Sequence, residues 1–383
     1  MSTSSDVVVV GAGVFGAWAA LQLRRSGRSV TLVDAFGAGN TRSSSGGASR
    51  VFRVGYGPDA IYSRWAQRSF NSWQELFRDG RQELFTRTGL LWMVRPDDPS
   101  TNESIQTFRQ LQVPFETLDR TELEERYPQF HFGPIARGLF EPEAGVIMAR
   151  SAVQAVVRQA VKQSVDYRVA AITPPEGRGE TLEALVTIGG DRITAGTFVF
   201  ACGPWLPKLF PTVLADRIHP TRQEVLFFGT EPGDRRFAPP AMPAWVDFSG
   251  GVYGLPDLEG RGFKIGLDHR GPPFDPDTAE RIVSEDVVQV ARMILAKRVP
   301  DLERAPLLEA HVCPYSNSWN GDFLIDQHPE LDNVWLVGGG SGHGFKHGPA
   351  VGEYVAGQLA QREAPEERFT IAAHSKSRGR EIF

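Results

Sequence analysis

The sequence predicts an α/β protein of two interleaved domains, one on a parallel sheet and one on an antiparallel sheet. A strand, a glycine-rich turn and a helix follow one another within the first 34 residues, and the same order returns at residues 333–361. Between them, residues 225–267 hold short, alternating, aromatic runs, which are typical of an antiparallel sheet. Because parallel-sheet pieces occur at both ends of the 383-residue chain, we expect discontinuous domains.

The individual elements follow from hydrophobic patterning and from the positions of glycine and proline. Residues 7–10 are all valine, which is typical of a strand buried on both faces. A helix is expected at 17–25, where Ser26-Gly27 ends it, and a second strand at 29–34. By the same criteria we expect helices at 61–77, 118–127, 151–165, 279–298 and 348–361, strands at 90–94, 197–201, 225–228, 251–254, 262–267 and 333–337, and loops at 40–57 and 338–346.

Charge and cysteine content exclude several classes of protein. The 41 Lys and Arg residues are outnumbered by 46 Asp and Glu, so no basic excess points to nucleic acid or an anionic membrane as a partner. No apolar run approaches the roughly 20 residues of a membrane-spanning helix, and we expect no secretory signal. Only Cys202 and Cys313 are present, which excludes a disulfide scaffold and favours a reducing, cytoplasmic location.

Metal and serine-hydrolase sites are not expected. His343 and His347 have the i, i+4 spacing of a zinc protease helix, but Gly344 does not supply the glutamate of that motif. The run Gly339-Gly340-Ser341-Gly342 continues with a histidine where a nucleophile elbow needs glycine. The chemistry must therefore come from other residues.

The first glycine motif, Gly11-Ala12-Gly13-Val14-Phe15-Gly16, fits G-x-G-x-x-G between a strand and a helix. One glycine permits the tight turn, one lets the backbone approach a pyrophosphate, and one lets helix and strand pack closely. The helix N-terminus offers N–H groups and partial positive charge to the phosphates. Asp34 ends the second strand, where its carboxylate can accept from a ribose hydroxyl. The motif predicts a dinucleotide site, and by itself it does not distinguish FAD from NAD.

A second glycine-rich loop precedes the last predicted helix. It reads Gly338-Gly339-Gly340-Ser341-Gly342-His343-Gly344-Phe345-Lys346, far along the chain from the first motif. A nicotinamide domain has no obvious need for this unit. A flavin has, because its pyrimidine edge becomes anionic on reduction and is stabilised by backbone N–H groups and a helix N-terminus.

At these motifs the chain resembles the monomeric sarcosine oxidase and N-methyltryptophan oxidase family of the D-amino-acid oxidase superfamily. The resemblance runs from Val7 to about Leu359 and rests on short strings in fixed order: Asp6–Gly16, 33–36, 49–53, 262–266, 312–315 and 341–346. It implies FAD as the cofactor. It also implies a Rossmann-like FAD-binding domain of residues 1–85, 150–220 and 310–373, a substrate domain of 86–149 and 221–309 on the antiparallel sheet, and a flexible tail of 374–383.

The resemblance implies which residues hold the cofactor. Cys313 matches a cysteine that bonds covalently to the flavin, whereas Cys202 is expected to be a buried structural thiol. The other residues expected at FAD are Gly11, Gly13, Val14, Phe15, Gly16, Asp34, Ala35, Ser45, Arg50, Gly340, Gly342, His343, Gly344, Phe345 and Lys346.

The resemblance also implies the catalytic residues. Arg53 and Lys346 match the pair that binds the substrate carboxylate, and two converging cations suit a small anion. Lys264 matches a lysine that faces the flavin and promotes reaction with dioxygen, because a fixed positive charge stabilises the superoxide anion. The pocket is completed by Arg50, Tyr253 and His269.

The implied reaction is oxidation of the C–N bond of a secondary (N-methyl or cyclic) or primary amino acid by a monomeric enzyme. The imine hydrolyses, and O₂ is reduced to hydrogen peroxide. A dehydrogenase of the same fold with another electron acceptor and a nucleotide-binding module without turnover remain alternatives. Ser45 and Gly46 replace a frequent histidine pair, Val54 replaces a histidine of sarcosine oxidase, and His347 stands where an apolar or aromatic residue is common. These departures leave the substrate side chain open.

Overall fold

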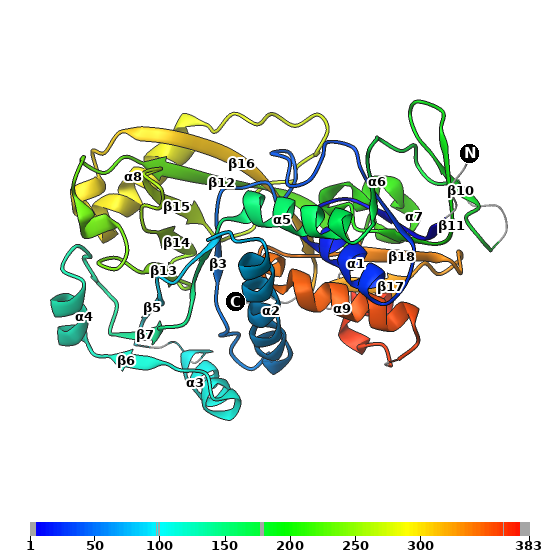
Figure 1. Ribbon diagram of the computed structural model, residues 1–383. Coiled ribbons are helices and arrows are strands. Elements are labelled where there is room, and N and C mark those ends of the chain that lie inside the picture. The colour runs from blue at the N-terminus through cyan, green and yellow to red at the C-terminus, as the bar shows by residue number, and fades with distance from the viewer. Residues whose placement is uncertain (1–4, 97, 99, 177–179, 363, 376–383) are drawn as a thin grey trace.

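Two large sheets at opposite ends of the molecule organise the fold (Figure 1). The computed structural model describes residues 5–96, 98, 100–176, 180–362 and 364–375. Within these residues no helix is both long and apolar enough to cross a membrane.

The first sheet is mainly parallel and has seven strands. Its order is β17-β18-β11-β1-β2-β9, with β10 paired to β11. Strand β1 (Ser5–Val10) lies between β11 and β2, and its valines are buried because neighbouring strands and helices cover both faces. The other strands are β2 (Val30–Asp34), β9 (Asp166–Val169), β10 (Ala184–Val186), β11 (Arg192–Phe200), β17 (Leu324–Gln327) and β18 (Val334–Gly338).

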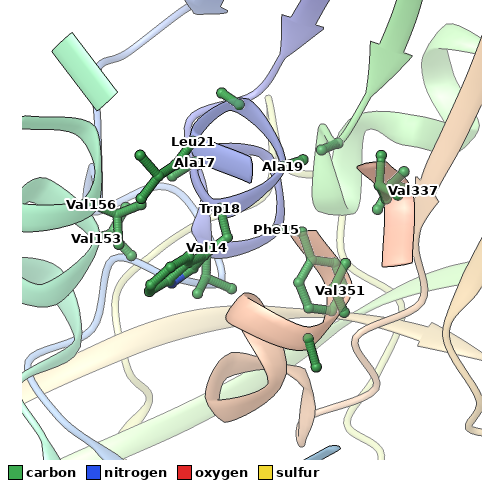
Figure 2. Close-up of a cluster of buried hydrophobic side chains, with 14 of the residues drawn as sticks. Val14, Phe15, Ala17, Trp18, Ala19, Leu21, Val153, Val156, Val337 and Val351 are labelled. Atoms are coloured by element: carbon green, nitrogen blue, oxygen red, sulfur yellow. The ribbon is translucent and has the colours of Figure 1, made fainter. Parts of the chain in front are cut away.

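Helix α1 (Val14–Arg25) forms the centre of the core beside this sheet. Figure 2 shows its apolar side chains between Val153 and Val156 of α5 (Ala149–Lys162) on one side and Val351 of α9 (Gly348–Leu359) on the other. The helices α1 and α9 touch closely, because a Cβ at Gly352 would lie 2.6 Å from the Trp18 carbonyl oxygen. This packing brings the two glycine-rich turns, which precede α1 and α9, to the same edge of the sheet.

The second sheet has eight strands and carries the other half of the molecule. Its order is β16-β12-β15-β14-β13-β5-β7-β6, antiparallel except for the β13–β5 pair. The strands are β5 (Leu90–Val94), β6 (Glu116–Leu118), β7 (Arg137–Glu141), β12 (Ile218–Phe228), β13 (Ala244–Asp247), β14 (Val252–Leu255), β15 (Phe263–Leu267) and β16 (Leu307–Ser318).

Smaller elements connect the two sheets. Helix α2 (Ala60–Asp79) packs against α9, and Trp18 of α1 meets Trp73 of α2 edge to face with ring centroids 5.1 Å apart. A three-stranded sheet joins β3 (Arg50–Phe52), β8 (Gly145–Ile147) and β4 (Phe85–Thr86). The remaining helices are α3 (Ser100–Leu111), α4 (Arg120–Arg126), α6 (Leu206–Leu209), α7 (Pro211–Leu214) and α8 (Glu285–Arg298).

Several sequence-based bounds need correction. The predicted loop at 40–57 contains β3, which pairs with β8 across about a hundred residues of sequence that local patterning does not connect. Helix α8 begins at Glu285 and not at 279, because Ser284 is its N-cap residue and Glu285 and Asp286 supply acidic side chains to the first turn. Helix α3 was not predicted.

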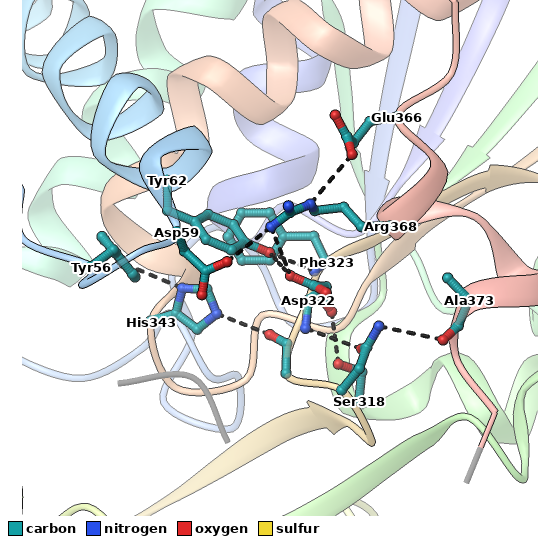
Figure 3. A network of polar contacts seen from close by, with 12 residues as sticks. Tyr56, Asp59, Tyr62, Ser318, Asp322, Phe323, His343, Glu366, Arg368 and Ala373 are labelled. Carbon is teal, nitrogen blue, oxygen red and sulfur yellow. Dashed lines mark hydrogen bonds and ion pairs between the residues drawn. The ribbon is translucent and has the colours of Figure 1, made fainter. Parts of the chain in front are cut away.

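The C-terminal segment is anchored to the rest of the fold at its described end. His374, where the sequence predicts the start of a flexible tail, is fully buried, with its ring nitrogens 2.8 Å from the Thr370 carbonyl oxygen and 3.2 Å from that of Asp322. Figure 3 shows Arg368 next to Asp59 and Asp322 in the same network. The tail prediction is therefore wrong for His374, and residues 376–383 lie outside the described part.

Candidate functional site

A cavity of about 570 Å³ opens along the edge where the two glycine-rich turns meet. It lies at the carboxyl ends of parallel strands, where ligands bind in open α/β sheets. Most of the residues predicted to hold FAD line it: Gly11, Gly13, Val14, Phe15, Asp34, Ala35, Ser45, Arg50, Gly340, Gly342, Gly344 and Phe345.

The glycines of the first turn have different roles. Gly11 has φ of +103°, and a Cβ on Gly16 would lie 1.8 Å from the Gly11 carbonyl oxygen, so these two glycines permit the turn and its packing. Gly13 is the N-cap residue of α1, and no side chain caps the helix there. A Cβ on Gly13 would meet only the Ser45 hydroxyl, at 3.4 Å. A ligand can therefore approach the backbone at Gly13 and the helix N-terminus, which fits a pyrophosphate.

Asp34 lies at the rim of this cavity, where its carboxylate organises the turn. It accepts hydrogen bonds from the backbone N–H groups of Ala12 (2.7 Å), Phe36 (2.8 Å) and Gly37 (2.8 Å). Burial raises the pKa of Asp34, and the three N–H donors oppose that rise. The position fits a carboxylate that reaches a ribose hydroxyl.

A second cavity of about 260 Å³ adjoins the first. Arg50, Tyr315, Gly342 and Phe345 line both cavities, so a ligand can extend from one into the other. All six residues predicted to be catalytic line this smaller cavity: Arg50, Arg53, Tyr253, Lys264, His269 and Lys346.

Arg53 and Lys346 are buried cations at the smaller cavity. The Arg53 guanidinium lies 4.3 Å from the Tyr56 ring centroid and 5.3 Å from that of Phe248, and it donates to the Gly55 carbonyl oxygen. The Lys346 ammonium donates to the Tyr56 hydroxyl (2.7 Å) and to the His343 carbonyl oxygen (3.0 Å). Burial, and then the charge of Arg53, hold the pKa of Lys346 well below its usual range.

Tyr56 connects Lys346 to two histidines that surround its hydroxyl. His347 Nε2 lies 2.8 Å and His343 Nδ1 3.2 Å from that oxygen, and His343 Nε2 lies 3.0 Å from the Gly321 carbonyl. A carbonyl only accepts, so His343 carries its proton on Nε2 and can accept at Nδ1 from Tyr56. His347 then donates from Nε2, since the buried Nδ1 has no partner in the described structure and an unpaired acceptor costs less than an unpaired N–H.

Lys264 and Arg50 approach the region where the two cavities meet. Lys264 Nζ donates to the Ser49 carbonyl oxygen (2.9 Å) and lies 5.9 Å from the Tyr253 ring centroid. Burial, followed by the charge of Arg50, lowers the pKa of Lys264 well below its ordinary value. Burying the Lys264 ammonium as a cation costs free energy, and a nearby anion would offset that cost.

Cys313 lies on β16 beside Arg50. Its sulfur is 3.0 Å from Arg50 Nη2 and 3.8 Å from the Ser44 carbonyl oxygen, and the side chain is buried. It does not line either of the two cavities, in contrast to Arg50, which lines both.

Some residues predicted for the site lie elsewhere, and some of its residues were not predicted. Gly16 packs helix against strand, and His343 lines the smaller cavity and not the larger one. Tyr56 and Asp268 were missed, and His347 was noted as a departure from the family pattern but not as a site residue. For Asp268 a signal existed, because even-numbered residues share the face of Lys264 on a strand. For Tyr56 the sequence holds no local signal. The described residues contain no cluster of metal ligands.

Comparison with known proteins gives a consistent family. The model of the FAD dependent oxidoreductase family matches residues 6–358. The chain is 32% identical over 364 residues to monomeric sarcosine oxidase of Streptomyces avermitilis, covering 93% of this chain and 94% of that protein. It is 26% identical to N-methyl-L-tryptophan oxidase of Yersinia pestis, covering 98% and 99%. The structure of L-proline dehydrogenase from P. horikoshii has the same fold, with a TM-score of 0.85, 20% identity and coverage of 97% and 98%.

Proposed function

The chain belongs to the FAD dependent oxidoreductase family, and from that premise we propose that it oxidises the C–N bond of an amino acid with dioxygen as electron acceptor. The substrate is a secondary amino acid, N-methylated or cyclic, or a primary one. The relatives named for sarcosine and N-methyl-L-tryptophan support this class. A fit of the larger cavity to FAD supports it as well, through the open backbone at Gly13 and the carboxylate of Asp34.

One observation carries the proposal: two buried cations line the smaller cavity next to the dinucleotide site. Arg53 and Lys346 lie far apart in sequence and reach the same cavity. Burying cations is costly, and a bound carboxylate offsets that cost. The guanidinium offers parallel N–H donors, and two of the three Lys346 N–H groups already point at Tyr56 and the His343 carbonyl, which leaves one for a ligand.

The residues of the chain bind and orient the substrate. When bound, FAD would supply the redox chemistry for removal of a hydride equivalent from the carbon beside nitrogen, with dioxygen as the final electron acceptor. Arg53 and Lys346 hold the substrate carboxylate, which fixes the position of the C–N bond. The cationic form of Lys264, held between Ser49 and two aromatic rings, stabilises negative charge that develops on dioxygen.

A peroxide-coupled screen tests the proposal. Purified holoenzyme is offered N-methyl amino acids, proline homologues and ordinary amino acids under air. We expect hydrogen peroxide from at least one class. Flavin bleaching under argon with slow recovery in air would favour the dehydrogenase alternative, and neither bleaching nor peroxide with any amino acid would contradict the proposal.

We also propose that Cys313 holds FAD covalently, because it matches the cysteine that bonds to the flavin in the resembling family and because Arg50, which lines both cavities, lies against its sulfur. Yellow colour that stays wholly in the supernatant after acid precipitation would contradict this.

The two free thiols, Cys202 and Cys313, support a cytoplasmic location. A monomeric state, as the names of several relatives suggest, is checked by light scattering. The domain bounds given above stay a prediction; β16 crosses the one at residue 310.

A further inference from the structure

Asp268 places a carboxylate in the smaller cavity. It directly follows β15, and the ladder continues one step beyond that strand, because the Asp268 N–H donates to the Gly251 carbonyl oxygen (2.8 Å). Side chains alternate along this backbone, so Asp268 shares the face of Lys264 and Gly266. That face points at the Tyr253 ring, since a Cβ on Gly266 would lie 2.5 Å from it. Lys264, Tyr253 and Asp268 all line the cavity.

The charge of Asp268 is placed among the cations that the proposed function assigns to the substrate carboxylate. Burial raises the pKa of Asp268, whereas the charges of Arg53, Lys346 and His269 lower it. Asp268 is deep enough in the protein for desolvation to act on it, yet the residue keeps accessible surface and lines the cavity, and its carboxylate forms no hydrogen bond or salt bridge with any residue that the structure describes. An accessible, uncommitted anion in a pocket with two cations is complementary to a zwitterion.

We propose that Asp268 is a specificity-determining residue that binds the cationic nitrogen of a zwitterionic amino-acid substrate. The inference rests on the proposed function and extends it: the pocket selects ligands that carry both charges. A plain carboxylate satisfies Arg53 and Lys346 and is repelled by Asp268. An amino acid satisfies all three. The negative charge of Asp268 thus lets the pocket discriminate amino acids from plain carboxylates, which the two cations alone cannot do.

The alternative residue is His269, which sequence resemblance favours. It lines the same cavity and is exposed, and its Nδ1 lies 3.4 Å from where a Cβ on Gly251 would stand. Its ring is on the opposite side of the chain from Asp268 by alternation. A protonated imidazole repels an ammonium group, and a neutral one can accept a hydrogen bond from it but carries no negative charge, so His269 does not supply the anion that complements the zwitterion.

The test compares two ligand types on wild-type holoenzyme and on Asp268→Asn. The first is an amino acid that the wild type turns over, measured by KM; the second is propionate, measured by its inhibition constant. We expect Asp268→Asn to raise the KM by about tenfold or more, as for loss of one charge-assisted hydrogen bond, and to tighten propionate binding. A structural defect would weaken both ligands together. Constants that move in the same direction, or that do not move, would overturn the proposal.

Two further variants sharpen the result. Asp268→Ser removes the charge with a smaller side chain and should reproduce the opposite shifts if the asparagine variant does not retain flavin. His269→Gln is the matched neighbour, for which we expect a smaller change in the ratio of the two constants. The proposal would be overturned if the KM and the inhibition constant moved in opposite directions in His269→Gln but not in Asp268→Asn or Asp268→Ser. If the wild type oxidises no amino acid, the proposed function itself is wrong, and the two failures stay distinct.

Discussion

Replacing Lys346 with methionine tests how the cavity binds an anion. The ammonium has two partners, the Tyr56 hydroxyl at 2.7 Å and the His343 carbonyl oxygen at 3.0 Å, and one N–H left for a carboxylate. Loss of one charge-assisted hydrogen bond costs about 1.5–3 kcal/mol, which is about 10- to 150-fold in affinity. Methionine keeps the length and packing of the side chain. We therefore expect Lys346→Met to weaken propionate binding by that factor with the flavin spectrum retained.

The pH dependence of the same binding constant gives a sharper result. Burial and Arg53 lower the pKa of Lys346 well below its ordinary 10.5, and a bound carboxylate favours the protonated form. Affinity is thus fully present below the lowered pKa and is lost as pH rises through it, well before pH 10.5. Propionate has no amine to titrate in this range. Lys264 is also buried with a lowered pKa, so Lys264→Met serves as the control.

The wild type and Lys264→Met should show this alkaline loss of affinity, and Lys346→Met should not. An identical alkaline limb in Lys346→Met would refute the assignment of Lys346 as the anion-binding cation. A tenfold loss of affinity in Lys346→Met, with no pH dependence in any variant, would mean that Lys346 keeps one protonation state over the whole range, and would refute the alkaline limb expected from its lowered pKa.

Three further predictions concern the cofactor, oxygen and stability. Gly16→Ala should unfold the domain or lower its stability by at least about 3 kcal/mol, because its Cβ meets backbone at 1.8 Å, whereas Gly13→Ala should fold and lose FAD, as flavin absorbance and thermal melting report. Lys264→Met should slow flavin reoxidation far more than flavin reduction in stopped flow; equal slowing would refute its role. Tyr62→Phe removes a 2.7 Å bond to a buried carboxylate and should lower the unfolding free energy by about 1.5–3 kcal/mol, unlike Tyr127→Phe, whose hydroxyl has no hydrogen-bond partner in the described structure.

Local sequence patterns were sufficient to predict the strand–turn–helix units that carry the two glycine-rich turns. The strand, turn and helix at residues 5–25 are determined by glycines and valines that are adjacent in sequence, and the bounds of the strand Leu90–Val94 agree with those predicted. The family was inferred from six short strings in fixed order along the chain, and the FAD cofactor from that resemblance. The start of α8 and the existence of α3 were missed, and so was β3, a strand of three residues that forms only by pairing with the distant β8.

The interior of the site could not be predicted to the same depth. Tyr56 precedes α2 and His347 precedes α9, so the two side chains meet only because these helices pack together. Asp268 could have been found from strand alternation, but the resemblance directed attention to the next residue, His269. Both residues line the cavity, so the resemblance identified the segment correctly but only one of its two polar side chains at the pocket.

A buried acid behind Arg53 explains how the fold keeps this cation in place. Glu141 is buried at the end of β7, accepts from the Val54 N–H (2.8 Å) and from Trp92 Nε1 (2.8 Å), and feels the charge of Arg53. Burial raises the pKa of Glu141, and these donors and Arg53 lower it, so the carboxylate is held chiefly by the segment that carries Arg53. Its bonds go to backbone and indole, so it holds the backbone next to Arg53 in place while the Arg53 side chain lines the cavity. The acid thus positions the arginine segment while Asp268 acts on the ligand, and the two anions of the site have separate roles.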